Sequence, residues 1–381
     1  MKQIDLVLAA GNRDLRLDLF RGIANWAIFL DHIPNNLIAW ITTRNYGFSD
    51  AADLFVFISG YTTAFVYARV MHDRGFAVAA IRLLKRAWQL YVAHVLVVVV
   101  FIVAIGFAAQ RFNLPALLHA YNVAGLNDDP IRTVFEGLLL KYRPVNLDVL
   151  PLNVVLMSCF PVVLWSMLRK PDLTLAASIA LYLAARTFDW NLPAFPQGYW
   201  YFNPLTWQLL FVTGAWLSLG GGSRSPQLTR PWVLCLAVAY LVFALVMTLA
   251  ASFQTLEAIM PKPLFAAFNP NDKTNLAPYR FIHLIVLAFV VTRFIPSDWK
   301  WLKWRGFRPA IVCGQHSLQV FCSGVFLSFM AHFALMLFGE THARGGILLQ
   351  LFVSLAGIAI LCAIAWCSEW ADRIDKPARV R

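Results

Sequence analysis

Charged residues are scarce in this chain. Asp, Glu, Lys and Arg make up 14% of the 381 residues, whereas apolar residues make up 60%. A water-soluble domain carries roughly a quarter charged residues, so the composition excludes one. No polar stretch between the apolar runs exceeds about forty residues, which is short of an ordinary domain. We therefore expect a single all-α membrane domain over residues 1–381, with polar tails at about 1–14 and 370–381.

Cysteine and the common catalytic motifs are also sparse. The six cysteines all lie in apolar segments, and none forms a Cys-x-x-Cys pair. This pattern argues against a disulfide framework and against a metal site, and we expect no metal and no permanently bound cofactor. The chain also lacks a glycine-rich phosphate loop and a Ser-His-Asp order, so it does not indicate a soluble-enzyme mechanism.

Long apolar segments, in contrast, recur from one end of the chain to the other. About ten approach the length that crosses a bilayer. They cover residues 17–40, 51–70, 87–109, 149–168, 172–188, 204–219, 232–252, 280–296, 310–338 and 346–368. An even number places both termini on one side, and Lys and Arg are about twice as frequent in the loops on that side, so both termini are expected in the cytoplasm. This asymmetry accounts for the net charge of +12 without a nucleic-acid partner.

The loops expected on the opposite side are longer and richer in aromatic, Asn, Asp and Pro residues. The main ones are 110–146, 188–202 and 253–279. Aromatic rings near a membrane surface usually anchor the protein in the interface. Interleaved with polar side chains, they also form a surface on which sugar rings stack. Both interpretations stay open.

The first apolar segment contains an arginine and a histidine, Arg21 and His32. Their spacing places both side chains on one face of a helix, about 16 Å apart along its axis. Charged groups at membrane depth are costly and usually functional. A ligand lying along this face would have its anionic part at Arg21, near the cytoplasm, and its reactive end at His32. The alternative is an arginine that reaches the interface and a histidine that bonds a neighbouring helix.

Several motifs together resemble a known family. The Arg-x10-His spacing, followed by FVFISGY at residues 55–61, resembles the membrane acyltransferase-3 superfamily. The chain is more closely similar to the OpgC family in the blocks RDLRLDLFRG (13–22), DHIP (31–34), RNYGFSDAA (44–52), DVLPL (148–152), FNPLTWQLLF (202–211) and DKTNLAP (272–278). The resemblance runs from residue 13 to about residue 325. It implies a multi-pass enzyme of the bacterial inner membrane that transfers succinyl groups from cytoplasmic succinyl-CoA to hydroxyls of osmoregulated periplasmic glucans.

For such a transfer, His32 is the expected general base, because a neutral imidazole can take a proton from a hydroxyl near neutral pH. Asp31 is adjacent in the chain but lies about 100° around the helix, so an orienting role beside His32 is not assumed. Asp53 and Asp148 are the other candidate catalytic carboxylates. Helix capping is the alternative for these two and for Asp50.

Binding residues are expected at both ends of the site. Arg21, His316 and Ser317 are the candidates for coenzyme A, with a polar packing contact as the alternative for His316. The acceptor or the free succinyl carboxylate would meet polar or aromatic side chains of the outward segments: Arg44, Asp50, Asn203, Trp207, Asp272, Lys273 and Arg280. Interfacial anchoring is the alternative for the three basic residues of this group.

Three functions are compatible with these patterns. The first is the glucan succinyltransferase, with an active site that reaches the periplasmic side of the membrane. The second is an acyltransferase with another acyl donor or another envelope glycan. The third is a transporter that uses Arg21, Asp31 and His32 as a relay or substrate site. Inverted repeats would favour transport, and the sequence shows no convincing internal repeat. The sequence does not specify an oligomeric state.

Overall fold

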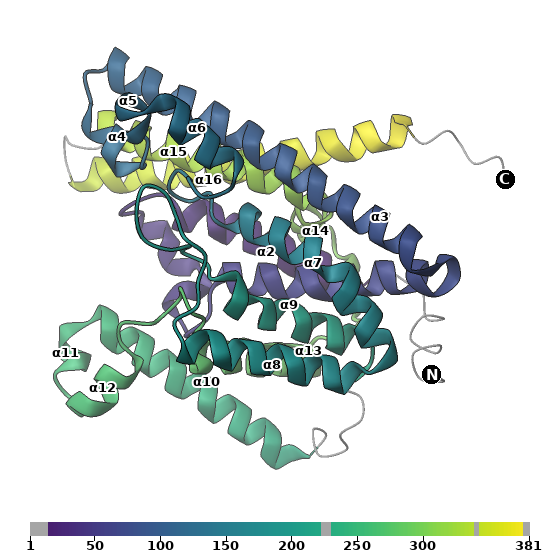
Figure 1. Ribbon diagram of the computed structural model, residues 1–381. Helices are drawn as coiled ribbons and strands as arrows, with labels where there is room; N and C mark the ends of the chain where they lie inside the picture. Colours follow the sequence, from purple (N-terminus) through teal and green to yellow (C-terminus); the bar gives the residue numbers. More distant parts are fainter. Residues whose placement is uncertain (1–13, 222–229, 339–342, 376–381) are drawn as a thin grey trace. The chain divides into compact units, whose positions relative to one another are not determined.

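The computed structural model describes residues 14–221, 230–338 and 343–375, and these residues are almost entirely helical or in turns (Figure 1). Within those ranges the one extended pairing is a bridge between Pro193 and Tyr199. The all-α expectation is confirmed. The chain forms two compact units, which are treated separately here. That the whole chain is one functional domain stays a prediction.

Unit 1 comprises Val56–Arg224 and Asp272–Leu276, and unit 2 comprises Asn12–Phe55, Ser225–Asn271 and Ala277–Arg381. Unit 1 holds most of α3 (Ala51–Arg111), then α4 (Ala116–Ala120), α5 (Gly125–Asp128), α6 (Pro130–Leu138), α7 (Val149–Arg169), α8 (Pro171–Thr187) and α9 (Pro204–Ser218). Unit 2 holds α2 (Leu15–Asp31), η1 (Leu37–Ile41), η2 (Thr43–Asn45), α10 (Pro231–Ser252), α11 (Gln254–Glu257), α12 (Lys262–Phe268), α13 (Pro278–Phe294), η5 (Lys300–Lys303), η6 (Arg305–Phe307), α14 (Arg308–Gln315), α15 (Ser317–Phe338) and α16 (Ala343–Asp375).

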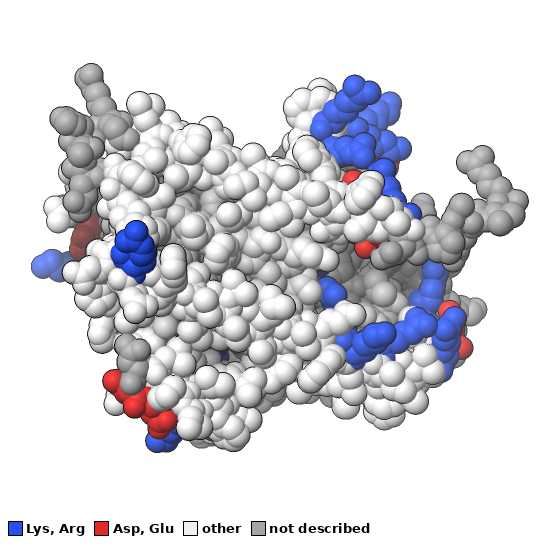
Figure 2. All heavy atoms as spheres, turned by 90° about the horizontal axis from the view of Figure 1, so that it is seen from above, with Lys and Arg blue, Asp and Glu red and all other residues white. Residues whose placement is uncertain are grey.

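Five of the described helices, α3, α7, α10, α15 and α16, are long and apolar enough to cross a membrane. On α10 and α16 only 22% of the most apolar stretch is buried inside the protein, which leaves their remaining surface for lipid. Figure 2 shows a face that is mostly uncharged, with Lys and Arg gathered in separate groups. The chain is thus a multi-pass membrane protein. The ten-span arrangement and the side of each terminus stay predictions.

Several segment boundaries differ from those expected. The segments expected at 51–70 and 87–109 both belong to α3, whose two helical parts meet in a kink at Gly75 (φ +82°, ψ 172°). This positive φ is readily adopted only by glycine. The segment expected at 310–338 is interrupted at His316, which ends α14 and precedes α15.

The first helix is also shorter than expected, because α2 ends at Asp31 rather than near residue 40. Pro34 has no N–H to continue a helix and restricts the residue before it, and Asn35 adopts a left-handed φ of 56°. The chain then makes the short turns η1 and η2. His32 is the residue that caps α2, and its backbone N–H bonds the Ile28 carbonyl at 3.1 Å.

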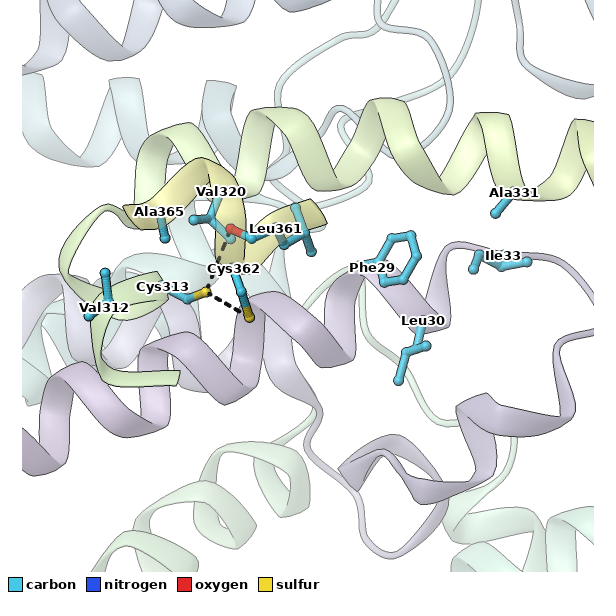
Figure 3. Close-up of a cluster of buried hydrophobic side chains, with 10 residues drawn as sticks. All are labelled: Phe29, Leu30, Ile33, Val312, Cys313, Val320, Ala331, Leu361, Cys362 and Ala365. Carbon is cyan, nitrogen blue, oxygen red and sulfur yellow. Dashed lines mark hydrogen bonds between the residues drawn. The ribbon is translucent and has the colours of Figure 1, made fainter. Parts of the chain in front are cut away.

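In unit 2, the α2 and α14 backbones touch. A Cβ atom at Gly22 would overlap the carbonyl group of Ala310, and one at Gly314 would overlap that of Asp18. Two glycines therefore allow this close approach. Further along α2, Phe29 packs in a cluster drawn from α2, α14, α15 and α16 and the turn after α2 (Figure 3): Leu30, Ile33, Val312, Cys313, Val320, Ala331, Leu361, Cys362 and Ala365. These contacts fix α2 within the unit.

We expect Gly22→Ala and Gly314→Ala each to lower stability by about 1–3 kcal/mol or more, the cost of overpacking, because the obstructing atoms belong to a helix backbone. The measurement is thermal unfolding of the purified protein in detergent. Gly106→Ala is the matched control, since a Cβ there would meet nothing within 4 Å. Equal melting temperatures for all three variants would show that the α2–α14 crossing is looser than described.

In unit 1, α9 packs against α7, α8 and the first part of α3. A Cβ at Gly60 would overlap the carbonyl group of Phe211, and one at Gly214 would overlap that of Phe57. The glycine of the FVFISGY motif thus serves helix packing. At the start of α9, Asn203 caps the helix by accepting a hydrogen bond from the Leu205 N–H at 3.0 Å.

Candidate functional site

Within unit 2, helix α2 carries Arg21, Asn25 and His32 on one face. The helical geometry persists through His32, whose φ and ψ are −85° and −5°. Asn25 is four residues after Arg21 and seven before His32, positions that share a face at 100° per residue. Arg21 and His32 are half-buried and Asn25 is buried. Arg21, Asn25 and His32 therefore lie along one face of α2 and its cap, with Arg21 and His32 about 16 Å apart along the axis.

At Asn25, between Arg21 and His32, this line contacts the break between α14 and α15. Asn25 Nδ2 donates to Ser317 Oγ at 3.3 Å, and Gln315 Nε2 donates to Asp18 Oδ2 at 3.4 Å. His316, which lies between them, caps α14. Ser317 thus contacts a residue one helical turn along α2 from Arg21, in a polar cluster formed by Asp18, Asn25, Gln315 and Ser317.

At the C-terminal end of α2, Asp31 holds the chain that follows His32. The Thr42 hydroxyl donates to Asp31 Oδ1 at 2.7 Å, and Arg44 Nη1 lies 3.9 Å from the same oxygen. Arg44 also donates to the Asp31 carbonyl at 3.3 Å, and its side chain is 51% exposed. Asp31 therefore positions the 42–44 turn beside His32. A direct part for Asp31 in catalysis stays a prediction.

A buried ion cluster joins the start of α3 to α13. Arg280 Nε donates to Asp53 Oδ1 at 2.9 Å, and Arg280 Nη2 lies 2.7 Å from Asp50 Oδ2. The Asp50 N–H donates to Asp53 Oδ2 at 2.8 Å. The Asp53 side chain is fully buried, whereas that of Asp50 is 14% exposed. Both carboxylates therefore hold Arg280, and Asp50 is the more exposed of the two.

Next to this cluster, His283 is fixed by Ser49. Its Nδ1 accepts from the Ser49 N–H at 3.3 Å and lies 2.7 Å from Ser49 Oγ. Because Nδ1 accepts from a backbone donor, the ring proton belongs on Nε2. The imidazole also packs against Gly47, where a Cβ would overlap the ring. The segment between His32 and α3 is therefore anchored on α13.

Unit 1 contains a second polar centre, at the start of α7. Arg143 Nε lies 3.1 Å from Asp148 Oδ1, and the Arg143 guanidinium stacks over the Trp200 ring at 4.3 Å from the centroid. Burial raises the pKa of the Asp148 carboxyl above its usual range, and the Arg143 and Lys273 cations oppose that rise. Asp148 thus has cations on both sides.

The 272–276 segment is held by side chains of α8 and α9. Asn203 Nδ2 donates to Asn275 Oδ1 at 2.9 Å, and Trp207 Nε1 donates to the Lys273 carbonyl at 3.0 Å. Arg186 Nη1 donates to Asp272 Oδ2 at 3.1 Å. Asn203 and Trp207 are fully buried. They position this segment, and Asp272 and Lys273 are its half-exposed charged residues.

Several residues of these centres were absent from the expected set, among them Asn25, Arg143, Arg186 and Asn275. Asn25 shares the face of Arg21 and His32, so the 3.6-residue period alone would have indicated it. Arg143 and Arg186 are indistinguishable in the sequence from other loop cations. Their partners, Asp148 and Asp272, become evident only in the folded unit.

Comparisons with known proteins give one match. A family model described as OpgC protein matches residues 13–373, nearly the whole chain. The matched range includes both polar centres. No curated protein and no solved structure matches the chain.

Proposed function

Because the chain belongs to the OpgC family, we propose that it is an O-acyltransferase that moves a succinyl group from cytoplasmic succinyl-CoA to a hydroxyl of a periplasmic glucan. Family membership indicates an acyltransferase acting on periplasmic glucans. The succinyl donor, the bacterial inner membrane as location and the residue roles below are the proposal.

The observation that carries the proposal is that Arg21, Asn25 and His32 lie along one face of α2 and its cap. A thioester made in the cytoplasm must meet a sugar outside, so the enzyme needs a path through the membrane with a cation at one end and a base at the other. We assign these roles to Arg21 and His32 because both lie on one face of α2 and its cap, and α2 packs closely against α14. The phosphates of coenzyme A would pair with Arg21, near the polar cluster that contains Ser317.

The reaction then requires a single base. His32 takes the proton of a glucan hydroxyl as the oxygen attacks the thioester carbonyl. The new C–O ester bond forms, the C–S bond breaks, and the coenzyme A thiolate receives the proton from the imidazolium. Asp31 contributes by holding the Thr42–Arg44 turn at the outer end. In unit 2, Asp50 is the proposed contact for the sugar or the free succinyl carboxylate.

The decisive experiment compares periplasmic glucan from cells with and without the protein by mass spectrometry. A mass difference of one succinyl unit per modified sugar supports the reaction and its donor together. Purified protein is then supplied with glucan and either labelled succinyl-CoA or labelled acetyl-CoA. Transfer of acetyl in place of succinyl would replace the proposed donor. Flux of unmodified glucan through proteoliposomes, without any covalent change, would replace acyl transfer by transport.

We expect Arg21→Ala to raise the apparent KM for succinyl-CoA about tenfold or more, since a hydrogen bond to a charged group contributes about 1.5–3 kcal/mol. The KM for glucan should change little. Initial rates at varied donor and fixed glucan test this. Arg305→Ala, which removes an exposed arginine outside α2, is the control. An unchanged donor KM in Arg21→Ala would remove this residue from the donor site.

A further inference from the structure

Helix α6 of unit 1 exposes an apolar stripe. Ile131, Val134, Phe135 and Leu138 are 84%, 52%, 59% and 45% exposed. Their spacing of three, four and seven residues places them on one face of the helix. The helix lies between α3 and α7 in the sequence, in a region that its polar and aromatic content marks as an outward loop.

The opposite face of α6 is the more polar one, and it points inward. The Thr133 side chain is fully buried, and its hydroxyl donates to the Gly125 carbonyl at 3.0 Å. The Glu136 carboxylate is 15% exposed and pairs with Lys141 at 3.3 Å. In a water-soluble protein the apolar face would be the buried one. A helix with its apolar residues outward and its polar residues inward is suited to surroundings of lipid.

Two contacts place this region beside the most apolar part of α3. The Tyr91 hydroxyl donates to the Leu138 carbonyl at 3.0 Å, and the Tyr121 ring packs edge-on against Phe101 at 5.6 Å. From Val92 to Ala109 every residue of α3 except His94 is apolar or glycine. The segment therefore follows α3 over about 15 Å of its apolar length, at 1.5 Å per residue.

The backbone of this region is well provided with internal partners, as an apolar solvent requires. The Val145 N–H donates to the Tyr121 carbonyl at 3.1 Å. The Tyr142 hydroxyl donates to the Asn122 carbonyl at 2.6 Å, and Asn122 Nδ2 donates to the Arg143 carbonyl at 2.9 Å. Irregular chain that is tied to itself in this way can lie at membrane depth.

We propose that α4, α5 and α6 form a membrane-embedded segment beside α3, in which the α6 stripe contacts lipid acyl chains. Exposed apolar residues of α3, among them Leu96, Val99 and Val103, provide the adjoining lipid-facing surface. The segment between α3 and α7 is then a re-entrant part of the membrane domain and not a free periplasmic loop. This inference does not depend on the proposed acyl transfer.

Spin labels on single cysteines test the proposal in proteoliposomes of the full chain. The six native cysteines are replaced first, and the cysteine-free protein must keep the far-ultraviolet circular dichroism of the original. Labels are placed at residues 131, 134, 135 and 138, and at residue 96 of α3 as the lipid-facing reference. Collision with oxygen, which partitions into lipid, is compared with collision with a water-soluble nickel chelate.

We expect the four stripe positions to resemble residue 96, with frequent oxygen collisions and loss of nickel collisions. Frequent nickel collisions at the stripe would overturn the proposal in favour of a water-exposed helix. Low collision with both reagents, together with dipolar broadening between labels, would overturn it in favour of a contact between two copies of the chain.

Discussion

His32→Ala is expected to abolish acyl transfer, with a loss of about 10²–10⁴-fold in turnover, the contribution typical of a general base. The physical reason is that a sugar hydroxyl is a weak nucleophile until its proton is removed. His32 caps α2 through its backbone N–H, which the substitution keeps. The variant should therefore fold and insert normally. Turnover is measured as transfer of labelled succinyl groups to purified glucan.

Two further variants make the result specific to His32. His32→Gln keeps a side chain that can hydrogen-bond but cannot accept the proton, so it should be as inactive as the alanine variant. His119→Ala removes an exposed histidine and should leave turnover unchanged. If either substitution of His32 retained wild-type turnover while the protein remained folded, another residue would have to serve as the base.

Arg280→Ala is expected to lower the free energy of unfolding by about 3–5 kcal/mol, because removing one partner of a buried ion pair leaves the other charge uncompensated. Asp53 is fully buried and would lose its guanidinium partner, and Asp50 would lose a contact of 2.7 Å. Thermal or denaturant unfolding in detergent measures the effect. Acyl transfer should fall as well, since the cluster fixes the start of α3 near the Asp50 carboxylate.

Arg44→Ala is the control for this experiment. Its side chain is 51% exposed and 3.9 Å from Asp31, so its loss should cost no more than about 1 kcal/mol. The double variant Asp53→Asn with Arg280→Gln removes both buried charges and should recover part of the lost stability. A similar loss in the double variant and in Arg280→Ala would mean that packing, and not charge, is what Arg280 provides.

The sequence predicts the helical class and the α2 line well, because both depend on local periods. A 3.6-residue repeat places Arg21 and His32 on one face wherever the helix sits, and α2 reaches Asp31, with His32 as its cap. Ser317, a candidate from the sequence, also lies against the same helix, because its hydroxyl accepts a hydrogen bond from Asn25.

Pairings between distant parts of the chain could not be predicted in this way. Asp53 and Arg280 are each a plausible substrate contact in the sequence, and only folding shows that they bind one another. Asn203 and Asn275 likewise meet across the chain. The α6 stripe likewise did not stand out in the sequence, because it is short and lies in a polar region.

The close crossing of α2 and α14 has a consequence for how this family can diversify. At Gly22, on the face of α2 that meets α14, there is no room for added atoms, since a single methyl group would meet the neighbouring backbone. We therefore expect substitutions that alter the choice of acyl group or sugar to lie at the two ends of α2 rather than at Gly22. The distance between the two ends of α2 would then stay the same in all members, and each acyl donor and acceptor would have to fit that distance.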